Sequence, residues 1–140
     1  MKKDVMIVTG AGQISMAIAR RVGFGKKIVL GDKSMDNCNA IAKIMTDAGY
    51  DIEPVEMDLS DRQSIKNIIA KAQEFGEIKY LVNGAGVSPS QAPIEAILKV
   101  DLYGTAVLLE EVGKVIAEGG DCVIIMMQPR NAHKMGLRAA

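Results

Sequence analysis

The amino-acid sequence predicts an α/β fold: a doubly wound parallel sheet of five strands with helices on both faces. Short apolar stretches alternate along the chain with stretches of helical periodicity. The first apolar stretch also ends in a glycine-rich turn that opens a helix. With 140 residues, the chain is long enough for one domain with its own hydrophobic core. The predicted strands are residues 4–10, 27–32, 52–59, 79–86 and 121–127.

The first half of the chain follows this alternation. Residues 4–10 are apolar and end in glycine, as a buried parallel strand would, and residues 15–22 predict a first helix. After the second strand, residues 34–48 predict a helix that Gly49 can end as its C′ residue. The apolar side chains of that helix gather on one face: Ile41, Ile44, Met45 and Ala48.

A helix with clear end signals separates the third and fourth strands. Pro54 is tolerated in the third strand if that strand lies near an edge. Ser60 is predicted to cap the following helix, with Gln63 in the capping-box position. The apolar stripe of this helix consists of Ile65, Ile68, Ile69 and Ala72. The fourth strand runs into a second glycine turn at its end.

A long helix and the fifth strand complete the predicted domain, which spans residues 1–128. The helix covers residues 93–117. Its predicted inward residues are Ile97, Val100, Gly104, Val107, Leu108 and Val115. Residues 129–140 are polar and lack periodicity, so they predict an irregular tail. Cys38 and Cys122 are predicted to be thiols in the core.

The composition argues against several classes of function. Lys+Arg and Asp+Glu both number 17, so the net charge gives no indication of a nucleic-acid or membrane partner. The longest apolar run, residues 122–127, is too short to span a bilayer. Two cysteines do not make a disulfide framework, and a cytoplasmic protein is expected. No metal site is expected, because the one histidine, His133, lies in the tail.

The turn after the first strand has features of a phosphate-binding loop. Gly10 permits a tight turn, Gly12 allows the backbone to approach a pyrophosphate, and the next helix begins with unpaired N–H groups. Ser15 stands where the fingerprint has a third glycine, and its hydroxyl could reach a phosphate oxygen. Alone, the G-x-G-x-x-S pattern fits dinucleotide binding and an ordinary βα turn equally well.

A carboxylate at the end of the second strand favours a nicotinamide dinucleotide. Asp32 follows Gly10 by 22 residues, a spacing at which it can accept hydrogen bonds from the ribose hydroxyls of NAD. It would also repel the 2′-phosphate of NADP. NAD is therefore the predicted cofactor. NADP stays open, because Lys33 can partly neutralise the charge of Asp32.

Five motifs together resemble the N-terminal, cofactor-binding half of the short-chain dehydrogenase/reductase family. They are VTGAG at residues 8–12, GD at 31–32, MDLSD at 57–61, LVNGAG at 81–86 and VDLYGT at 100–105. The resemblance covers residues 1–128, nearly the whole chain. It implies a Rossmann-like sheet with the strand order 3-2-1-4-5, truncated relative to the full family fold.

The resemblance also implies a set of cofactor-binding residues. They are Gly10, Gly12, Gln13 and Ile14 at the pyrophosphate, Asp32, Lys33, Asp58 and Leu59 at the adenosine, and the turn Asn83, Gly84, Ala85 and Gly86 beside the ribose. Asp101 stands where the family has an asparagine of its catalytic relay. A carboxylate accepts hydrogen bonds but does not donate them, so that role is not carried over.

The catalytic residues of the family are absent from this sequence. Its chemistry uses a serine after the fifth strand and a Tyr-x-x-x-Lys on the next helix. Here the last serine is Ser90, and no tyrosine is followed four residues later by lysine. No catalytic residue is therefore predicted. The expected function is an NAD(P)-binding oxidoreductase module that is not catalytically competent alone. The alternative is a non-catalytic nucleotide-binding or interaction protein with the same fold.

The implied strand order leaves the fifth strand at an outer edge of the sheet. Residues 121–127 are apolar on both faces, and an exposed apolar edge invites pairing with another chain. The long helix is expected to expose either Leu102, Leu109 and Val112 or its opposite face as well. We therefore expect a homo-oligomer, unless residues 129–140 fold back and cover the edge.

Overall fold

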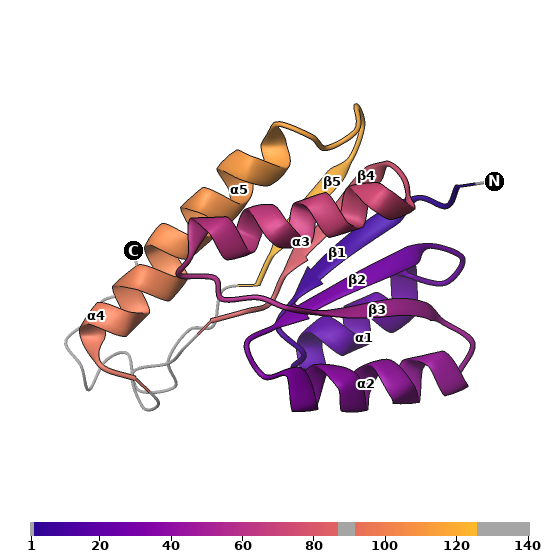
Figure 1. Ribbon diagram of the computed structural model, residues 1–140, viewed down its shortest axis with the longest axis horizontal. Coiled ribbons are helices and arrows are strands. Elements are labelled where there is room, and N and C mark those ends of the chain that lie inside the picture. The colour runs from indigo at the N-terminus through magenta and orange to yellow at the C-terminus, as the bar shows by residue number, and fades with distance from the viewer. Residues whose placement is uncertain (1, 87–91, 126–140) are drawn as a thin grey trace.

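The computed structural model describes residues 2–86 and 92–125. Its centre is a single five-stranded parallel sheet in the order β3-β2-β1-β4-β5, which confirms the predicted fold class and strand order (Figure 1). The strands are β1 (Val5–Thr9), β2 (Lys27–Asp32), β3 (Asp51–Glu56), β4 (Ile78–Asn83) and β5 (Asp121–Ile124). Since all five strands are parallel, their carboxyl ends lie along one edge of the sheet.

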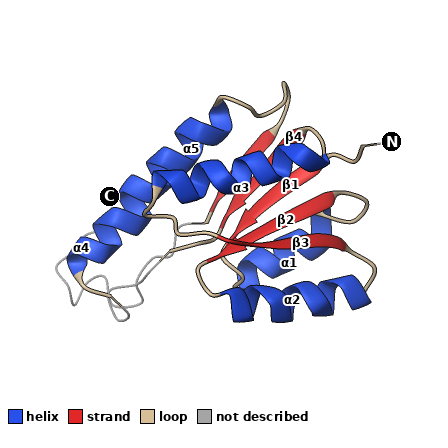
Figure 2. Cartoon of the chain, in the orientation of Figure 1, coloured by secondary structure: helices blue, strands red, loops and turns tan. Residues whose placement is uncertain are grey.

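Helices cover both faces of this sheet (Figure 2). They are α1 (Gln13–Val22), α2 (Met35–Asp47), α3 (Arg62–Phe75), α4 (Ile94–Ile97), the π-helix η1 (Leu98–Gly104) and α5 (Thr105–Gly113). Alternate residues of β1 serve the two faces. Val5 and Ile7 pack in the cluster that includes residues of α3 and α5, whereas Met6 and Val8 pack in the cluster that includes residues of α1 and α2. All four side chains are fully buried, which explains why β1 is a continuous apolar run.

The predicted long helix is a continuous run of three helical segments, with a wider π-helix in the middle. The π-helix η1 separates α4 from α5, and α5 ends at Gly113, earlier than the sequence predicted. Gly104 is buried, and a Cβ added there would overlap the carbonyl oxygen of Leu59. The missing side chain therefore lets the helix approach the loop after β3. π-Helical turns inside α-helices occur frequently at functional sites.

The start of α3 differs from the prediction. Asp61, not Ser60, is the N-cap, and its carboxylate accepts a hydrogen bond from the backbone N–H of Gln63 at 3.0 Å. The Ser60 hydroxyl instead donates to Asp58 Oδ1 at 2.7 Å. The sequence could not distinguish these neighbouring capping residues, because both types accept hydrogen bonds well at a helix N-terminus.

Some burial predictions were also wrong. Ile44 is 54% exposed and Ala48 is exposed too, since α2 turns toward the sheet only the face that carries Cys38, Ala42 and Met45. Cys122 is exposed, because it lies on the outermost strand, whereas Val112 is fully buried against the sheet.

Two other local predictions, for β3 and for the end of α2, are confirmed. Pro54 lies in edge strand β3, and Gly49 follows the C-cap of α2 with a φ of +94°. In the part of the chain that the structure describes, no helix combines the length and the apolar character needed to cross a membrane. The predictions for residues 126–127 and for the tail, residues 129–140, lie outside the described residues.

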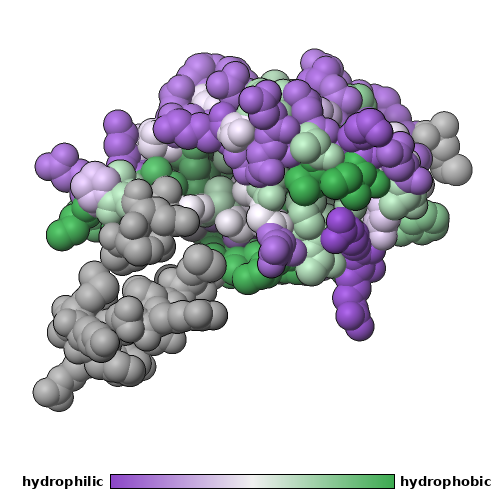
Figure 3. Space-filling model, turned by 90° about the horizontal axis from the view of Figure 1, so that it is seen from below, coloured by the Kyte–Doolittle hydropathy of each residue, from purple (hydrophilic) through white to green (hydrophobic). Residues whose placement is uncertain are grey.

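Apolar side chains remain exposed on the helical run that follows β4. On one side of this run, Ile94 is 74% exposed, Leu98 53% and Leu102 68%. Val123 of β5 is 45% exposed. A space-filling view of one face of the molecule shows hydrophobic residues gathered in a band on a surface that is otherwise largely hydrophilic (Figure 3).

Candidate functional site

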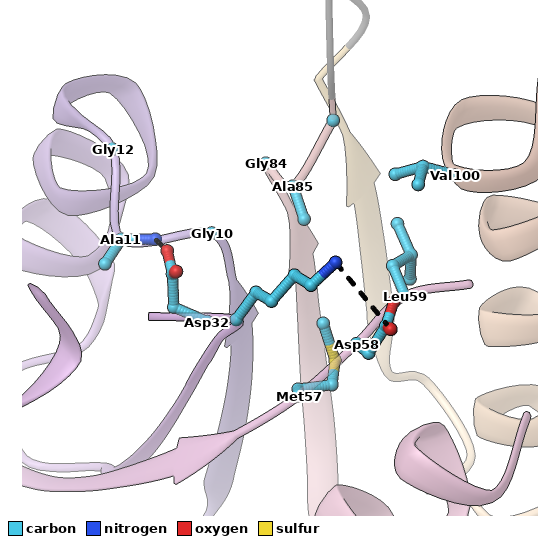
Figure 4. Close-up of a pocket in the computed structure, with 12 residues that line it drawn as sticks. Gly10, Ala11, Gly12, Asp32, Met57, Asp58, Leu59, Gly84, Ala85 and Val100 are labelled. Carbon is cyan, nitrogen blue, oxygen red and sulfur yellow. Dashed lines mark hydrogen bonds and ion pairs between the residues drawn. The ribbon is translucent and has the colours of Figure 1, made fainter. Parts of the chain in front are cut away.

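A cavity of about 290 Å³ opens at the carboxyl ends of the central strands (Figure 4). Parallel α/β sheets bind ligands in this position. The loops after β1, β2, β3 and β4 build it, together with one residue of η1. The lining residues are Gly10, Ala11, Gly12, Asp32, Lys33, Met57, Asp58, Leu59, Gly84, Ala85, Gly86 and Val100.

Gly10 brings the two glycine turns together. Its φ is +81°, a backbone conformation that glycine adopts without strain. A Cβ added at Gly10 would lie 2.7 Å from the backbone nitrogen of Ala85 and 2.8 Å from the carbonyl carbon of Gly84. The turn after β1 therefore touches the turn after β4 only because residue 10 has no side chain.

Gly12 faces open space instead. A Cβ added there would meet no heavy atom within 4 Å. Gly12 is also the N-cap of α1, and no side chain caps this helix, whereas Ser34 caps α2 and Asp61 caps α3. The first N–H groups of α1 are thus left without a side-chain acceptor beside an open cavity, a combination that fits a phosphate group.

Ser15 does not take the role that its hydroxyl suggested. It is 2% exposed, and its hydroxyl donates to the Thr9 carbonyl at 3.5 Å. A Cβ on Gly84 would overlap this hydroxyl. Ser15 therefore packs from α1 against the turn after β4, and its hydroxyl does not face the cavity in this arrangement.

Asp32 holds the loops after β1 and β2 in place. Its Oδ2 accepts a hydrogen bond from the Ala11 N–H at 2.7 Å, and its Oδ1 accepts one from the Ser34 N–H at 2.8 Å. Each carboxylate oxygen can accept a second hydrogen bond. Asp32 is therefore a rigid acceptor at the cavity wall that keeps capacity for ligand hydroxyls.

Asp58 is the second fixed carboxylate of the cavity. Its Oδ1 accepts hydrogen bonds from the Ser60 N–H at 2.9 Å and from the Ser60 hydroxyl at 2.7 Å. The Ser60 hydroxyl lowers the pKa of Asp58, partial burial opposes this, and the charges of Lys33 and Lys99 lower it further. Asp58 is thus held as an oriented anion.

Asn83 lies beneath the cavity and does not line it. It is 2% exposed; its side-chain oxygen accepts from the Thr9 hydroxyl, and its amide donates to the Thr105 hydroxyl at 3.3 Å. The network ties β1, β4 and α5 together under the second glycine turn. Gln13 and Ile14 are exposed at the start of α1 and are not among the lining residues either.

Three lining residues were missed by the sequence analysis: Ala11, Met57 and Val100. Ala11 contributes its backbone N–H, which carries no side-chain signal. Met57 immediately precedes Asp58 in a motif already singled out. Val100 lies on η1, the element in which Gly104 packs against Leu59, and this packing is seen only in the three-dimensional structure.

Asp101 is also close to the second glycine turn. A Cβ added to Gly86 would lie 3.1 Å from Asp101 Oδ1, so the carboxylate limits the space beside this turn. In the described ranges, 2–86 and 92–125, no group of three or more His, Cys, Asp or Glu side chains could hold a metal ion. His133 lies outside these ranges.

Comparison with known proteins connects this site to a family. The family model described as short chain dehydrogenase matches residues 4–138. The short-chain dehydrogenase/reductase bsc3 of Alternaria brassicicola is 38% identical over 125 residues, covering 89% of this chain and 46% of that protein. The chain spans about half the length of the curated relatives it matches.

Solved structures of the same fold include complexes with both nicotinamide cofactors. A short-chain dehydrogenase/reductase from Burkholderia phymatum in complex with NAD superposes with a TM-score of 0.74 at 22% identity, covering 88% of this chain and 48% of that chain. An actinorhodin polyketide ketoreductase variant with NADPH gives 0.71 at 24% identity, covering 80% and 47%.

Proposed function

Because the chain belongs to the short-chain dehydrogenase family, we propose that its cavity binds NAD as the cofactor-binding part of an oxidoreductase. The observation that carries this proposal is the Asp32 carboxylate, fixed by Ala11 and Ser34 next to the open space at Gly12. A dinucleotide offers groups that match both: ribose hydroxyls for the carboxylate and a pyrophosphate for the helix N-terminus.

In the proposed complex, each loop binds one part of the cofactor. Gly10, Gly12 and the backbone of Gln13 and Ile14 hold the pyrophosphate at the start of α1. Asp32 accepts from the adenosine ribose, Asp58 and Leu59 contact the adenine, and residues 84–86 lie along the ribose. Asn83 acts indirectly by steadying the turn through Thr9 and Thr105. When bound, the nicotinamide would supply the hydride chemistry of the family.

We propose NAD as the preferred cofactor, with NADP as the weaker one. Asp32 would repel a 2′-phosphate, and Lys33, whose side chain is 81% exposed, offsets only part of this repulsion. Solved proteins with the same fold hold either cofactor: one was solved with NAD and another with NADPH. A cytoplasmic location is proposed as well, consistent with two free cysteines.

Calorimetric titration tests the proposed binding. NADH should bind with a dissociation constant below about 1 mM, and reduced nicotinamide mononucleotide, which lacks the adenosine, should bind at least about tenfold more weakly. The difference is expected because the fixed carboxylates line the adenosine part of the proposed site. Absence of NADH binding at millimolar concentration would overturn the proposal.

We propose that the 140-residue chain lacks hydride-transfer activity by itself. A positioned acid–base group typically contributes about 10²- to 10⁴-fold to the rate, and the serine and Tyr-x-x-x-Lys of the family are absent. Purified protein should therefore give no NADH oxidation above background with a panel of ketones and aldehydes. Steady turnover that disappears in Asp32→Ala would contradict this prediction and identify a different proton donor. The alternative function, a non-catalytic nucleotide-binding or interaction protein, shares this expectation.

A homo-oligomer is proposed from the exposed apolar surface of the helical run and β5. Leu102 is 68% exposed and Val123 45%. Burying such surface favours association by about 25 cal/mol per Å² before the entropy loss is subtracted. Light scattering should give a mass above 15.0 kDa, the mass of one chain, at high concentration.

Two variants sharpen the test of association. Leu102→Lys should shift the protein toward the monomer, whereas Ile44→Lys, a matched change at a 54% exposed position on α2, should not. A monomer of 15.0 kDa at high concentration, unaffected by deletion of residues 129–140, would contradict the proposed assembly. It would also contradict the alternative that these residues fold back and cover the edge of the sheet.

A further inference from the structure

Arg62, the first residue of α3, forms ion pairs with two neighbouring carboxylates of α5, and Figure 1 shows the start of α3 beside α5. Its Nη1 lies 2.6 Å from Glu111 Oε1, and its Nη2 lies 3.1 Å from Glu110 Oε2. Lys114 Nζ lies 3.1 Å from the same oxygen of Glu111. Among the residues that the structure describes, Glu111 is the only charged one that is buried. A buried carboxylate needs such partners, so losing one of them costs more than losing an exposed ion pair.

The same guanidinium also interacts with η1. The two glutamates, and after them Tyr103 of η1, raise the pKa of Arg62 by hydrogen bonding to its charged form. The π-helix has little apolar packing to hold it: Gly104 is its one buried residue, and apolar side chains such as Leu102 are exposed. The position of η1 therefore depends strongly on the polar contacts at Arg62 and on the helix α5 that continues from it.

Together, η1 and the loop after β3 form one wall of the cavity (Figure 4). Val100 lines the cavity from η1, and it packs against the core cluster that contains Met57 and Leu59. The two segments meet where a Cβ added to Gly104 would overlap the Leu59 carbonyl oxygen. Arg62 follows Leu59 by three residues and joins the same two parts of the chain next to this contact.

We propose that Arg62 is a positioning residue of the cavity: its contacts with α5 and η1 hold the wall formed by Val100 and Leu59 in the position that a bound dinucleotide requires. The inference rests on the proposed cofactor function and concerns a residue that does not line the cavity. Without these contacts, η1 would leave its position for part of the time. The apparent dissociation constant rises in proportion as the fraction of protein that is competent to bind falls.

Calorimetric titration of Arg62→Met with NADH tests this role. Methionine keeps much of the apolar stem of the side chain and removes the guanidinium. We expect the dissociation constant for NADH to rise about 3- to 10-fold.

Lys27→Met is the matched control. The Lys27 side chain is 13% exposed and also lies between two carboxylates, 2.8 Å from Asp51 Oδ1 and 3.9 Å from Glu53 Oε2. It joins β2 to β3 at the amino-terminal ends of the strands, away from the cavity. Its loss should lower the midpoint of urea unfolding by an amount similar to that of Arg62→Met, but it should leave the dissociation constant for NADH unchanged within about twofold.

Hydrogen exchange without ligand measures the position of η1 directly. Amides of residues 98–104 should exchange at least about tenfold faster in Arg62→Met than in the wild-type protein, and at the wild-type rate in Lys27→Met. Arg62→Lys keeps the charge but lacks the planar fork that binds two carboxylates, so both of its effects should be intermediate. If Arg62→Met does not fold, Arg62→Lys decides by the same two measurements.

The outcomes separate this role from the proposed function. If the wild-type protein binds NADH and Arg62→Met binds it equally well, the positioning role is refuted while the proposed function stands. An equal loss of affinity in Arg62→Met and Lys27→Met would reveal a general effect of lower stability and would refute the role too. If the wild-type protein does not bind NADH, the proposed function fails, and the positioning role fails with it.

Discussion

Replacement of Asp32 by alanine is expected to weaken NAD binding by about 10- to 100-fold and to destabilise the protein even without ligand. The affinity loss follows from removing charge-assisted hydrogen bonds to the ribose. The stability loss follows from the two backbone N–H groups, of Ala11 and Ser34, that lose their acceptor. Leaving two such groups without a protein partner is expected to cost about 1–3 kcal/mol.

The measurements are calorimetric titration with NAD and NADP and urea unfolding without ligand. Asp36→Ala is the matched control, because Asp36 is an exposed carboxylate in the first turn of α2, close in sequence to Asp32 but not among the cavity residues. The control should change neither affinity by more than about twofold. Unchanged affinities for both cofactors in Asp32→Ala would remove Asp32 from the site.

Gly10→Ala is expected to destabilise the fold much more than Gly25→Ala. Both glycines have a φ of +81°, so alanine meets the same backbone strain of about 1–2 kcal/mol at each. Only at Gly10 does the new Cβ collide with another loop, 2.7 Å from the Ala85 nitrogen, whereas nothing lies within 4 Å at Gly25. That collision is expected to add about 1–3 kcal/mol, because the turns after β1 and β4 must separate.

Urea unfolding followed by far-UV circular dichroism measures both losses. Equal losses in the two variants would show that the turns after β1 and β4 tolerate separation, against the packing described here. If Gly10→Ala fails to fold while Gly25→Ala folds, the difference already lies in the expected direction.

Much of the fold could be predicted because buried parallel strands carry a strong apolar signal. β1 shows this most clearly: its successive side chains Met6, Ile7 and Val8 serve two different core clusters, so no polar residue interrupts the run. Predictions failed where the signal was weaker. Ile44 lies beside Met45 in the sequence, yet only Met45 faces the sheet, and a rotation of the helix by one position decides which of them is buried.

Most residues that line the cavity were singled out from the sequence, but the contacts that connect them were not. The glycines and the carboxylates Asp32 and Asp58 follow strand ends, and parallel topology brings strand ends together at one edge. That Asp32 also anchors the Ala11 backbone, and that Ser15 turns inward to Thr9, depends on contacts between side chains and backbone that have no sequence pattern. The π-helix that places Val100 at the cavity likewise has no recognised sequence signal.

The measurement that tests the central claim most directly is the mapping of NADH onto the ¹⁵N-labelled protein by NMR titration. If the cavity binds the dinucleotide as proposed, the largest amide shifts will occur at the turn after β1, residues 10–14, at Asp32 and Lys33, at Asp58 and Leu59, and at residues 84–86. Amides on α2 and on the amino-terminal side of the sheet, such as Asp51, should not move. Saturable shifts confined to residues outside the cavity, or no shifts at millimolar NADH, would contradict the account.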